Sequence, residues 1–435
     1  MAIARGVSVS THRTMFIVLL SLVVGICIKA IGVLLVSAFG VIPACAAQLL
    51  SRIFTHSLKF KGNSVNRSKF IGIASGTALA AGTTSYLLSD RSNLLRADIN
   101  LTDSKNAMLK PDEAEILFLA SLAPSGHNTQ PWFVQYLEPY HWIIGNDKNK
   151  WLPAVDPTQR ETMLSIGAFL QNLDYAASAF GYVCDWTLLA TTNQDDRVMS
   201  VKLLKEASKN AFDIAKIKSR RTVRSNFLSD VLKPEDLKYL VNSEPKFIHY
   251  LPTTSKESQF INEQTIAANR LQSHRDPAQQ ELANWIRFSS KDAEKYRDGL
   301  TTASMEIEGI SGWVVRNFYD KDNVMKKDFR ERGIDTVKQE VSASAGWILI
   351  TSKDNSVAAF LETGRRMQRL FLKVREKGIA IHPMTQILEE ASTRQTLNQS
   401  IGINESIQFI LRSGYVKNYP QPVSLRRPID WFIRT

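Results

Sequence analysis

Apolar residues follow three different patterns along the 435 residues of this chain. Met15 to Leu50 is almost continuously apolar, interrupted by Lys29, and it exceeds the roughly 20 residues that a helix needs to span a bilayer. A polar, basic link then leads to Phe70 to Leu88, a second and milder apolar stretch. Further along, alternating runs and 3.6-residue periods replace these long stretches. The pattern predicts a hydrophobic membrane segment within residues 1–95, followed by a globular part.

The basic link sets the expected orientation of the N-terminal region. Lys and Arg residues are frequent between the two apolar stretches, and basic residues favour the cytoplasmic side of a membrane. If the link lies on the cytoplasmic side, the second stretch crosses the membrane and places the large domain on the other side. This holds whether the first stretch crosses once as a tilted helix or twice as a hairpin. In an alternative interpretation the second stretch is a processed signal. Both place the large domain on the non-cytoplasmic (periplasmic) side, and the first predicts a membrane-anchored protein.

Helical and strand patterns alternate in the globular part. Asp156 is a plausible helix N-cap with Pro157 in the first turn, and apolar residues from Met163 to Phe180 recur every 3.6 residues until Gly181 stops the helix. These patterns predict a globular part that contains both helices and strands. A further helix is expected over residues 112–122, and strands are expected over residues 133–138, 140–145, 182–190, 198–204 and 407–411.

Two helical segments far apart in the chain share the same spacing of small residues. Gly167 and Gly181 are fourteen positions apart, and so are Gly364 and Gly378. Each helix follows a β-like run that contains a tryptophan. A chance match is the alternative to an internal duplication. Duplication predicts two halves that form a pseudo-dimer in one chain, with central helices in close contact at their small residues.

The composition narrows the kinds of partner. A net charge of +12 permits an anionic partner, such as a phosphate-bearing cofactor, an acidic membrane surface or nucleic acid. The sequence has no zinc-finger spacing, no RRM signature and no sustained basic helix, so nucleic acid is not expected. The three cysteines, two of them in the first apolar stretch, indicate neither a disulfide framework nor a metal cluster.

One loop, over residues 123–132, combines turn residues with short polar side chains. It lies between a predicted helix and a predicted strand, and Pro124 is one of the residues that punctuate it as a turn. Ser125, Asn128 and Gln130 add side chains that could hydrogen-bond the edge of a flat polar ring. An ordinary polar turn is the alternative interpretation.

The loop motif A-P-S-x-x-N-x-Q-P-W resembles the flavin-contacting loop of the FMN-dependent nitroreductase family. From about residue 112 to residue 427 the chain resembles the Acg-type branch, in which two nitroreductase-like halves are fused. The resemblance implies an α+β fold, a nitroreductase-like three-layer α/β/α sandwich, with FMN at the interface of the two halves. It also implies that Pro124, Ser125, Asn128 and Gln130 contact the flavin.

A second motif lies at the start of the second half. R-R-T-V-R over residues 220–224, with Phe227, is similar to the R-R-S/T-x-R-x-F signature that opens ordinary nitroreductases, where basic side chains grip the FMN phosphate. Arginine suits this role because it offers bidentate, charge-assisted donors. In isolation, such a group is more often a solvated basic turn. The phosphate ligands implied by the resemblance are Arg220, Arg221, Thr222 and Arg224.

Each half retains a part of the site that the other half lacks. The first half has the polar loop but no arginine motif before it, and the second half has the arginine motif but no such loop after it. One complete site can therefore be assembled, which predicts one FMN per chain. The C-terminal R-R-P tail is similar to that of nitroreductases, in which a basic residue also reaches the phosphate. Arg426 and Arg427 are equal candidates for that residue.

These motifs divide the chain into three predicted parts. Residues 1–95 form the N-terminal region, residues 96–215 the first half, and residues 216–435 the second half with a lid-like insertion at about 275–325. By similarity to the Acg-type branch, Tyr296-Arg297-Asp298-Gly299 and Trp313 could form a lid over the flavin ring. A surface insertion with no role at the flavin is the alternative.

Three functions are compatible with the sequence. The first is an FMN-dependent oxidoreductase that uses NAD(P)H and passes hydride through flavin N5 to a small nitroaromatic or quinone-like acceptor. The second is an FMN-binding or storage protein with an occluded site, and the third is a membrane-anchored interaction protein with a decayed site. No catalytic side chain is expected, because His127 and His382 have no nucleophile–acid partners in the sequence and are read as packing or surface residues.

Overall fold

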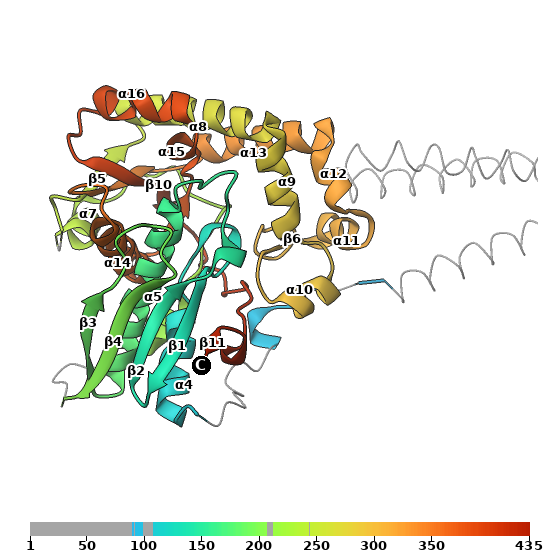
Figure 1. Cartoon of the computed structure of the whole chain (residues 1–435). Coiled ribbons are helices and arrows are strands. Elements are labelled where there is room, and N and C mark those ends of the chain that lie inside the picture. The colour runs from blue at the N-terminus through green and yellow to red at the C-terminus, as the bar shows by residue number, and fades with distance from the viewer. Residues whose placement is uncertain (1–88, 91, 99–107, 207–211, 243) are drawn as a thin grey trace, which may run out of the picture. The chain divides into compact units, whose positions relative to one another are not determined.

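The computed structural model describes residues 89–90, 92–98, 108–206, 212–242 and 244–435 (Figure 1). Both apolar stretches and the basic link lie outside these residues, so the membrane prediction stays a prediction. Within the described ranges, no helix combines the length and apolarity that crossing a membrane requires. Contacts divide the chain into two units, Met1–Arg91 with Glu308–Val314, and Ser92–Ile307 with Val315–Thr435. The second unit holds both predicted motifs and is described below.

The first half of the second unit is built on a sheet whose strand order is β11-β1-β2-β4-β3 (Figure 1). Strands β1 to β4 fall where the sequence predicts strands, whereas β11 was not predicted. The C-terminal strand β11 pairs in parallel with β1, so the end of the chain joins the sheet of the first half. The strands are β1 (Trp132–Glu138), β2 (His141–Asn146), β3 (Tyr182–Leu188), β4 (Arg197–Lys205) and β11 (Ile433–Arg434).

The second half contains an antiparallel sheet of order β5-β8-β10-β9. Strand β8 is buried along its whole length because apolar residues cover both of its faces. One face packs in a core with α14 (Val357–Val374). The other packs in a separate core with α8 (Lys256–His274), α13 (Lys327–Ser342) and α15 (Gln386–Glu389). The strands are β5 (Ile248–Pro252), β8 (Gly346–Ser352), β9 (Ile379–Pro383) and β10 (Ser406–Tyr415).

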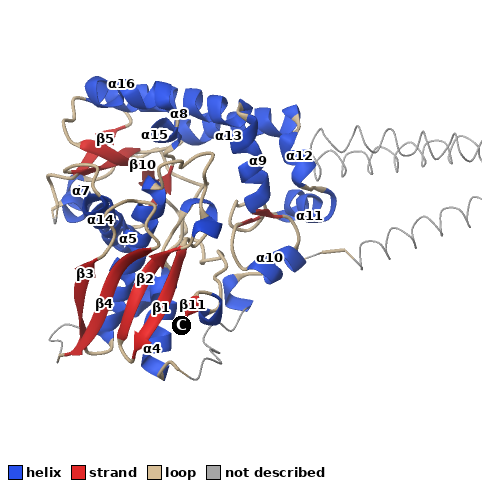
Figure 2. Cartoon of the chain, in the orientation of Figure 1, coloured by secondary structure: helices blue, strands red, loops and turns tan. Residues whose placement is uncertain are grey.

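Helices α5 and α14, the two repeated segments, pack against each other between the two sheets (Figure 2). Two short strands, β6 (Ile286–Arg287) and β7 (Leu300–Thr301), form a parallel pair in the insertion. The helices are α4 (Pro111–Ser121), α5 (Arg160–Ala179), α6 (Ile214–Ser219), α7 (Pro234–Val241), α8 (Lys256–His274), α9 (Asp276–Trp285), α10 (Ser290–Tyr296), α11 (Gly309–Phe318), α12 (Lys321–Met325), α13 (Lys327–Ser342), α14 (Val357–Val374), α15 (Gln386–Glu389) and α16 (Ala391–Ile401).

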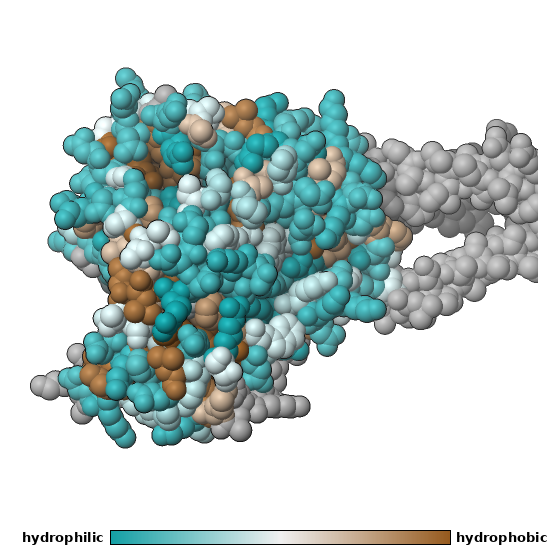
Figure 3. Space-filling model, in the orientation of Figure 1, coloured by the Kyte–Doolittle hydropathy of each residue, from teal (hydrophilic) through white to brown (hydrophobic). Residues whose placement is uncertain are grey.

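The α+β prediction is confirmed, and the three-layer arrangement holds for the second half. In the first half, α4 and α5 share a core with the inner face of the sheet. On β3 the other face is exposed, because the alternate residues Val183, Asp185 and Thr187 are open to solvent. Figure 3 shows a mostly hydrophilic face with apolar patches in the region of β3 and β4. At that edge the predicted outer helical layer is absent from the described part of the chain.

Helix α5 begins later than the sequence indicates. Pro157 was expected in its first turn, but Gln159 adopts a left-handed conformation with φ of 57°, so the helix starts at Arg160. Asp156 still serves the helix start, because its Oδ2 accepts a hydrogen bond of 3.0 Å from the backbone N–H of Thr162. The carboxylate therefore caps a first turn that is displaced by three residues from the predicted one.

Candidate functional site

The polar loop between α4 and β1 has an unusual backbone. His127, Asn128 and Gln130 all have positive φ angles, 45°, 55° and 54°. Such conformations cost on the order of 1–3 kcal/mol for each residue and are concentrated at functional sites. The Ser125 hydroxyl oxygen accepts a 2.9 Å hydrogen bond from the backbone N–H of Gln130, which fixes the turn. The loop is therefore a constrained structure and differs from an ordinary polar turn.

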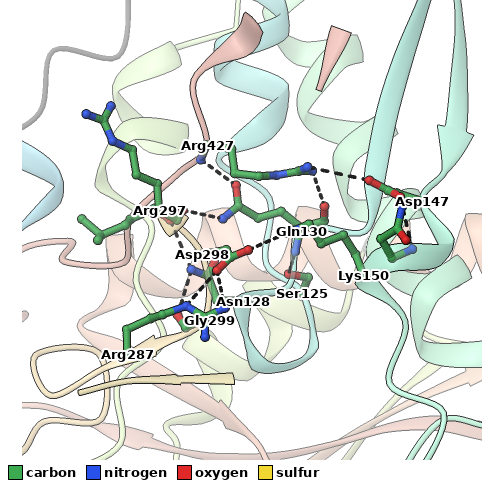
Figure 4. Close-up of polar contacts among 12 residues, drawn as sticks. Ser125, Asn128, Gln130, Asp147, Lys150, Arg287, Arg297, Asp298, Gly299 and Arg427 are labelled. Carbon is green, nitrogen blue, oxygen red and sulfur yellow. Dashed lines mark hydrogen bonds and ion pairs between the residues drawn. The ribbon is translucent and has the colours of Figure 1, made fainter. Parts of the chain in front are cut away.

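The side chains of Asn128 and Gln130 hold a turn of the insertion (Figure 4). Asn128 Nδ2 donates to the carbonyl of Gly299 at 3.1 Å, and Gln130 Nε2 donates to the carbonyl of Arg297 at 2.9 Å. The backbone N–H of Gly299 donates back to the carbonyl of Asn128 at 3.1 Å. Both amide side chains are buried. The structure thus brings residues 297–299 to the loop, where they bind these amides directly, and a contact of the amides with a flavin ring stays a prediction.

Asp298 fixes the same turn by charge. Its carboxylate accepts hydrogen bonds from Arg287 Nε at 3.0 Å and Nη2 at 2.6 Å, and from Lys150 Nζ at 2.6 Å (Figure 4). The Asp298 side chain is only 1% exposed. Lys150 follows β2 in the first half, so the ion pair links the insertion to that half. Trp313, which was also predicted to belong to the lid, is part of the first unit. There its indole N–H donates a hydrogen bond to Ser89 Oγ.

The two C-terminal arginines, Arg426 and Arg427, also contact the polar loop. Arg426 donates to the carbonyls of Ser121, Leu122 and Ala123, where α4 ends, and to Asn128 Oδ1 at 2.8 Å. Burial, followed by the nearby positive charges of two further arginines, lowers the pKa of Arg426 well below its usual value. Because Nε, Nη1 and Nη2 all donate within the protein, Arg426 is committed to holding the loop.

Arg427 is also engaged with the loop. Its backbone N–H donates to Gln130 Oε1 at 2.9 Å, and its Nη2 donates to the carbonyls of Gln130 and Trp132. Asp147 lies 3.9 Å from Arg427 Nη1. Burial lowers the pKa of Arg427 to about 10, while Asp147 and Asp298 oppose the shift. Arg427 therefore has acidic neighbours, unlike Arg426.

Arg220 of the arginine motif lies against the same end of α4. Its Nη2 donates to the Leu122 carbonyl at 3.1 Å, and its guanidinium stacks over the Phe371 ring at 5.1 Å. Burial, with a smaller contribution from the charge of Arg96, lowers its pKa to about 9. The buried Nε and Nη1 atoms have no hydrogen-bond partner among the described residues. Unpaired cationic donors of this kind favour an anionic ligand, since burial without a partner is costly.

Arg221 and Arg224 face a different part of the insertion, the turn at residues 301–307. Glu306 accepts hydrogen bonds from Arg221 Nη2 at 3.1 Å, the Arg224 backbone N–H at 3.1 Å and the Ser225 hydroxyl at 2.6 Å. Arg224 Nε donates to the carbonyl of Ser304 at 3.1 Å. The Arg221 and Glu306 side chains are 8% and 7% exposed. A carboxylate of the chain itself therefore pairs with this part of the motif.

Two histidines from different halves lie near Arg224. His382 Nε2 accepts a 2.6 Å hydrogen bond from Arg224 Nη1. Burial and the positive charges of Arg224 and Arg412 keep the pKa of His382 well below its usual value. Burial and Arg224 likewise lower the pKa of His127 to about 4. Both imidazoles are therefore neutral at neutral pH, and both belong to an Arg224-centred group that the sequence does not reveal.

The structure thus joins the two predicted motifs at one place, with some residues nearer than others. Pro124, Ser125 and Thr222 are half-buried parts of these segments. Arg426 and Arg427 contact the loop directly, and Arg220 contacts Leu122, the residue before it. Sequence reasoning missed Glu306, Arg96 and Arg375. No periodic or motif signal marks these residues, since each is brought to the site by an element far away in the chain.

Comparison with known proteins adds independent information. A family model described as the ABC 3 transport family matches residues 1–87, outside the described residues. The acg protein of Mycobacterium tuberculosis, named as an NAD(P)H nitroreductase, is 27% identical over 327 residues, which cover 72% of this chain and 92% of that protein. PigM of Serratia sp., also named as an NAD(P)H nitroreductase, is 22% identical over 316 residues, which cover 68% of this chain and 86% of PigM.

Among solved structures, this chain is similar to the FMN-dependent nitroreductase NfnB from Mycobacterium smegmatis in complex with NADPH. The match has 16% identity and a TM-score of 0.32, and it covers 51% of this chain and 99% of that one. The acg and PigM matches extend over most of each relative and most of this chain. The chain is thus similar over most of its length to proteins named as NAD(P)H nitroreductases.

Proposed function

We propose that the protein is an FMN-dependent oxidoreductase of nitroreductase type, which takes hydride from NAD(P)H and passes it to a small nitroaromatic or quinone-like acceptor. One observation carries the proposal. The arginine motif of one half contacts the Leu122 carbonyl, directly before the loop of the other half, and two guanidinium atoms of Arg220 have no hydrogen-bond partner among the described residues. Relatives named as NAD(P)H nitroreductases support the choice of donor.

The residues present fit a bound flavin nucleotide in two respects. Arg220 offers buried cationic donors for a phosphate, and Ser125 has a hydroxyl hydrogen that its bond with Gln130 does not use, because the oxygen accepts there. When bound, FMN supplies the hydride chemistry. The protein would contribute binding and orientation, since the pKa values of His127 and His382 are too low for either to be an imidazolium at neutral pH.

A flavin-storage function is the second candidate, and the insertion favours it. Residues 297–299 bind the side chains of Asn128 and Gln130, and Glu306 binds the arginine motif. An insertion held in this way would restrict access of a nicotinamide donor to the flavin. Storage predicts a flavin-loaded protein with little NAD(P)H oxidation, whereas the oxidoreductase function predicts turnover with an added acceptor.

The test uses the full chain, purified in detergent. Its visible spectrum is recorded, and the released chromophore is identified and quantified after denaturation. Near-stoichiometric FMN with NADH- or NADPH-dependent reduction of a quinone would support the oxidoreductase function. FMN without turnover would support storage. A folded, colourless protein that does not bind added FMN would refute both and favour the third function, interaction through a decayed site.

A further inference from the structure

Four arginines gather where α4 and α6 end, and they are called here the four-arginine cluster: Arg96, Arg220, Arg375 and Arg426. Arg96 donates to the carbonyl of Lys218, and Arg375 donates to the carbonyl of Ser219. Arg220 and Arg426 both donate to the carbonyl of Leu122, at 3.1 and 3.2 Å. The four guanidinium groups come from segments that are distant in the sequence, and they meet beside the start of the arginine motif.

The cluster has an unbalanced charge. Within the described ranges, none of its four arginines forms an ion pair with a carboxylate, whereas Arg221 pairs with Glu306 and Arg427 lies near Asp147. The electrostatic neighbours that affect Arg220 and Arg426 most are other arginines of the cluster. Tyr419, which lies under Arg375 at 4.7 Å, does not supply the missing charge, because burial raises the pKa of its phenol to about 12.

Capping of the two helix ends explains part of this arrangement. Cations are stabilised near the carbonyl end of a helix, and all three nitrogens of the Arg426 guanidinium are used in this way or on the loop. Capping does not explain Arg220, which is only 6% exposed and whose buried Nε and Nη1 have no hydrogen-bond partner in the part of the chain that the structure describes. Unused donors among four like charges indicate that an anion belongs there.

We propose that the four-arginine cluster holds the phosphate of FMN, with Arg220 donating to it directly and Arg96 and Arg375 as additional ligands. Arg426 contributes charge rather than hydrogen bonds, because its donors are already used. This inference rests on the proposed function and deepens it. It sorts the arginines of the predicted site, since Arg221, Arg224 and Arg427 lie beside carboxylates of the chain itself and are not the main phosphate ligands.

The test compares FMN with riboflavin, which lacks the phosphate. Flavin-free full-length protein is titrated with each flavin, and the dissociation constant is measured by flavin fluorescence. Arg220→Gln and Arg96→Gln are each expected to weaken FMN binding by roughly 10- to 100-fold and to leave riboflavin binding within about twofold. Arg332→Gln in α13, an exposed arginine, is the control with the same change in charge, and it should alter neither constant.

The outcomes separate the explanations. An equal loss for FMN and riboflavin would mean that the arginines only stabilise the helix ends, and unchanged FMN binding in both variants would also overturn the inference. Arg96→Lys keeps the charge and should retain most of the FMN affinity. If Arg220→Gln does not fold, the two Arg96 variants decide, because Arg96 is only partly buried and its replacement is less disruptive. Wild-type protein that binds neither flavin would instead refute the proposed function itself.

Discussion

Gly167 of α5 and Gly364 of α14 lie against each other, and at each glycine the backbone of the facing helix fills the space that a side chain would need. A Cβ atom on Gly364 would lie 2.0 Å from the carbonyl oxygen of Leu164, and one on Gly167 would lie 2.2 Å from the carbonyl oxygen of Leu361. Neither distance is possible for real atoms, so the two helix backbones approach each other only because both residues are glycine. This contact lies at the centre of the core that joins the two halves.

Gly364→Ala is therefore expected to force α5 and α14 apart and to destabilise the protein by about 1–3 kcal/mol, a typical cost of overpacking. The free energy of unfolding is measured by urea titration with tryptophan fluorescence. Gly333→Ala in α13 is the control, because a Cβ atom there meets nothing within 4 Å. In that exposed helix the substitution should stabilise by up to about 1 kcal/mol. Equal effects of the two substitutions would contradict the close-contact explanation.

The same pair shows why much of the fold could be predicted from the sequence. Strands β1 to β4 and helices α4 and α5 fall where local patterns predict them, and a repeated glycine spacing marks the contact between the halves. The exact start of α5 was missed because it depends on the left-handed conformation of one residue, Gln159. The exposed outer face of β3 was missed because a resemblance to a family gives the general layers and not the local departures from them.

The candidate site was predictable only where it consists of local motifs. The polar loop and the R-R-T-V-R segment could be found because their residues are close together in the sequence. Glu306 and Arg96 could not, since a single acidic or basic residue has no pattern and reaches the site through the fold. The roles of Asn128 and Gln130 also needed coordinates, because only the structure shows that the insertion occupies their amides.

Glu306→Gln should destabilise the protein by up to about 3–5 kcal/mol, because it leaves the Arg221 guanidinium buried without its carboxylate partner. The glutamine keeps an acceptor for the backbone N–H of Arg224, so the effect reports mainly on charge. Unfolding by urea provides the measurement. Glu308→Gln, two residues further on and exposed, is the matched control and should stay within about 0.5 kcal/mol of the wild type. Similar stabilities for both variants would show that the ion pair is not stabilising.

Asp298→Asn should loosen the attachment of the insertion to the polar loop. The change leaves Arg287 and Lys150 without a carboxylate at a position that is 1% exposed. We expect faster cleavage within residues 290–305 by limited proteolysis, together with a lower melting temperature. Asp322→Asn in α12 removes an equal charge from an exposed position and serves as the control. A cleavage rate equal to that of the control would mean that backbone hydrogen bonds alone hold the insertion in place.

Glu389 makes stability depend on pH in the direction opposite to that of an ordinary carboxylate. Burial, followed by the charge of Glu161, raises its pKa above the ordinary value of 4.5, although hydrogen bonds from Gln272 and Thr385 oppose the shift. The folded protein therefore holds this proton more tightly than the unfolded chain does. Its contribution to stability is fully present below pH 4.5 and is lost as the pH rises through the higher pKa of the folded state.

Glu389→Gln mimics the protonated carboxyl group and should remove this pH dependence. Melting temperatures of the variant and the wild type are compared between pH 5 and pH 9. The variant should gain relative to the wild type as the pH rises, because only the wild type must bury a carboxylate near Glu161 under alkaline conditions. Glu294→Gln, at an exposed position in α10, should give a difference that does not change with pH. A constant difference for Glu389→Gln as well would mean that its carboxyl group ionises as readily in the folded state as in the unfolded chain.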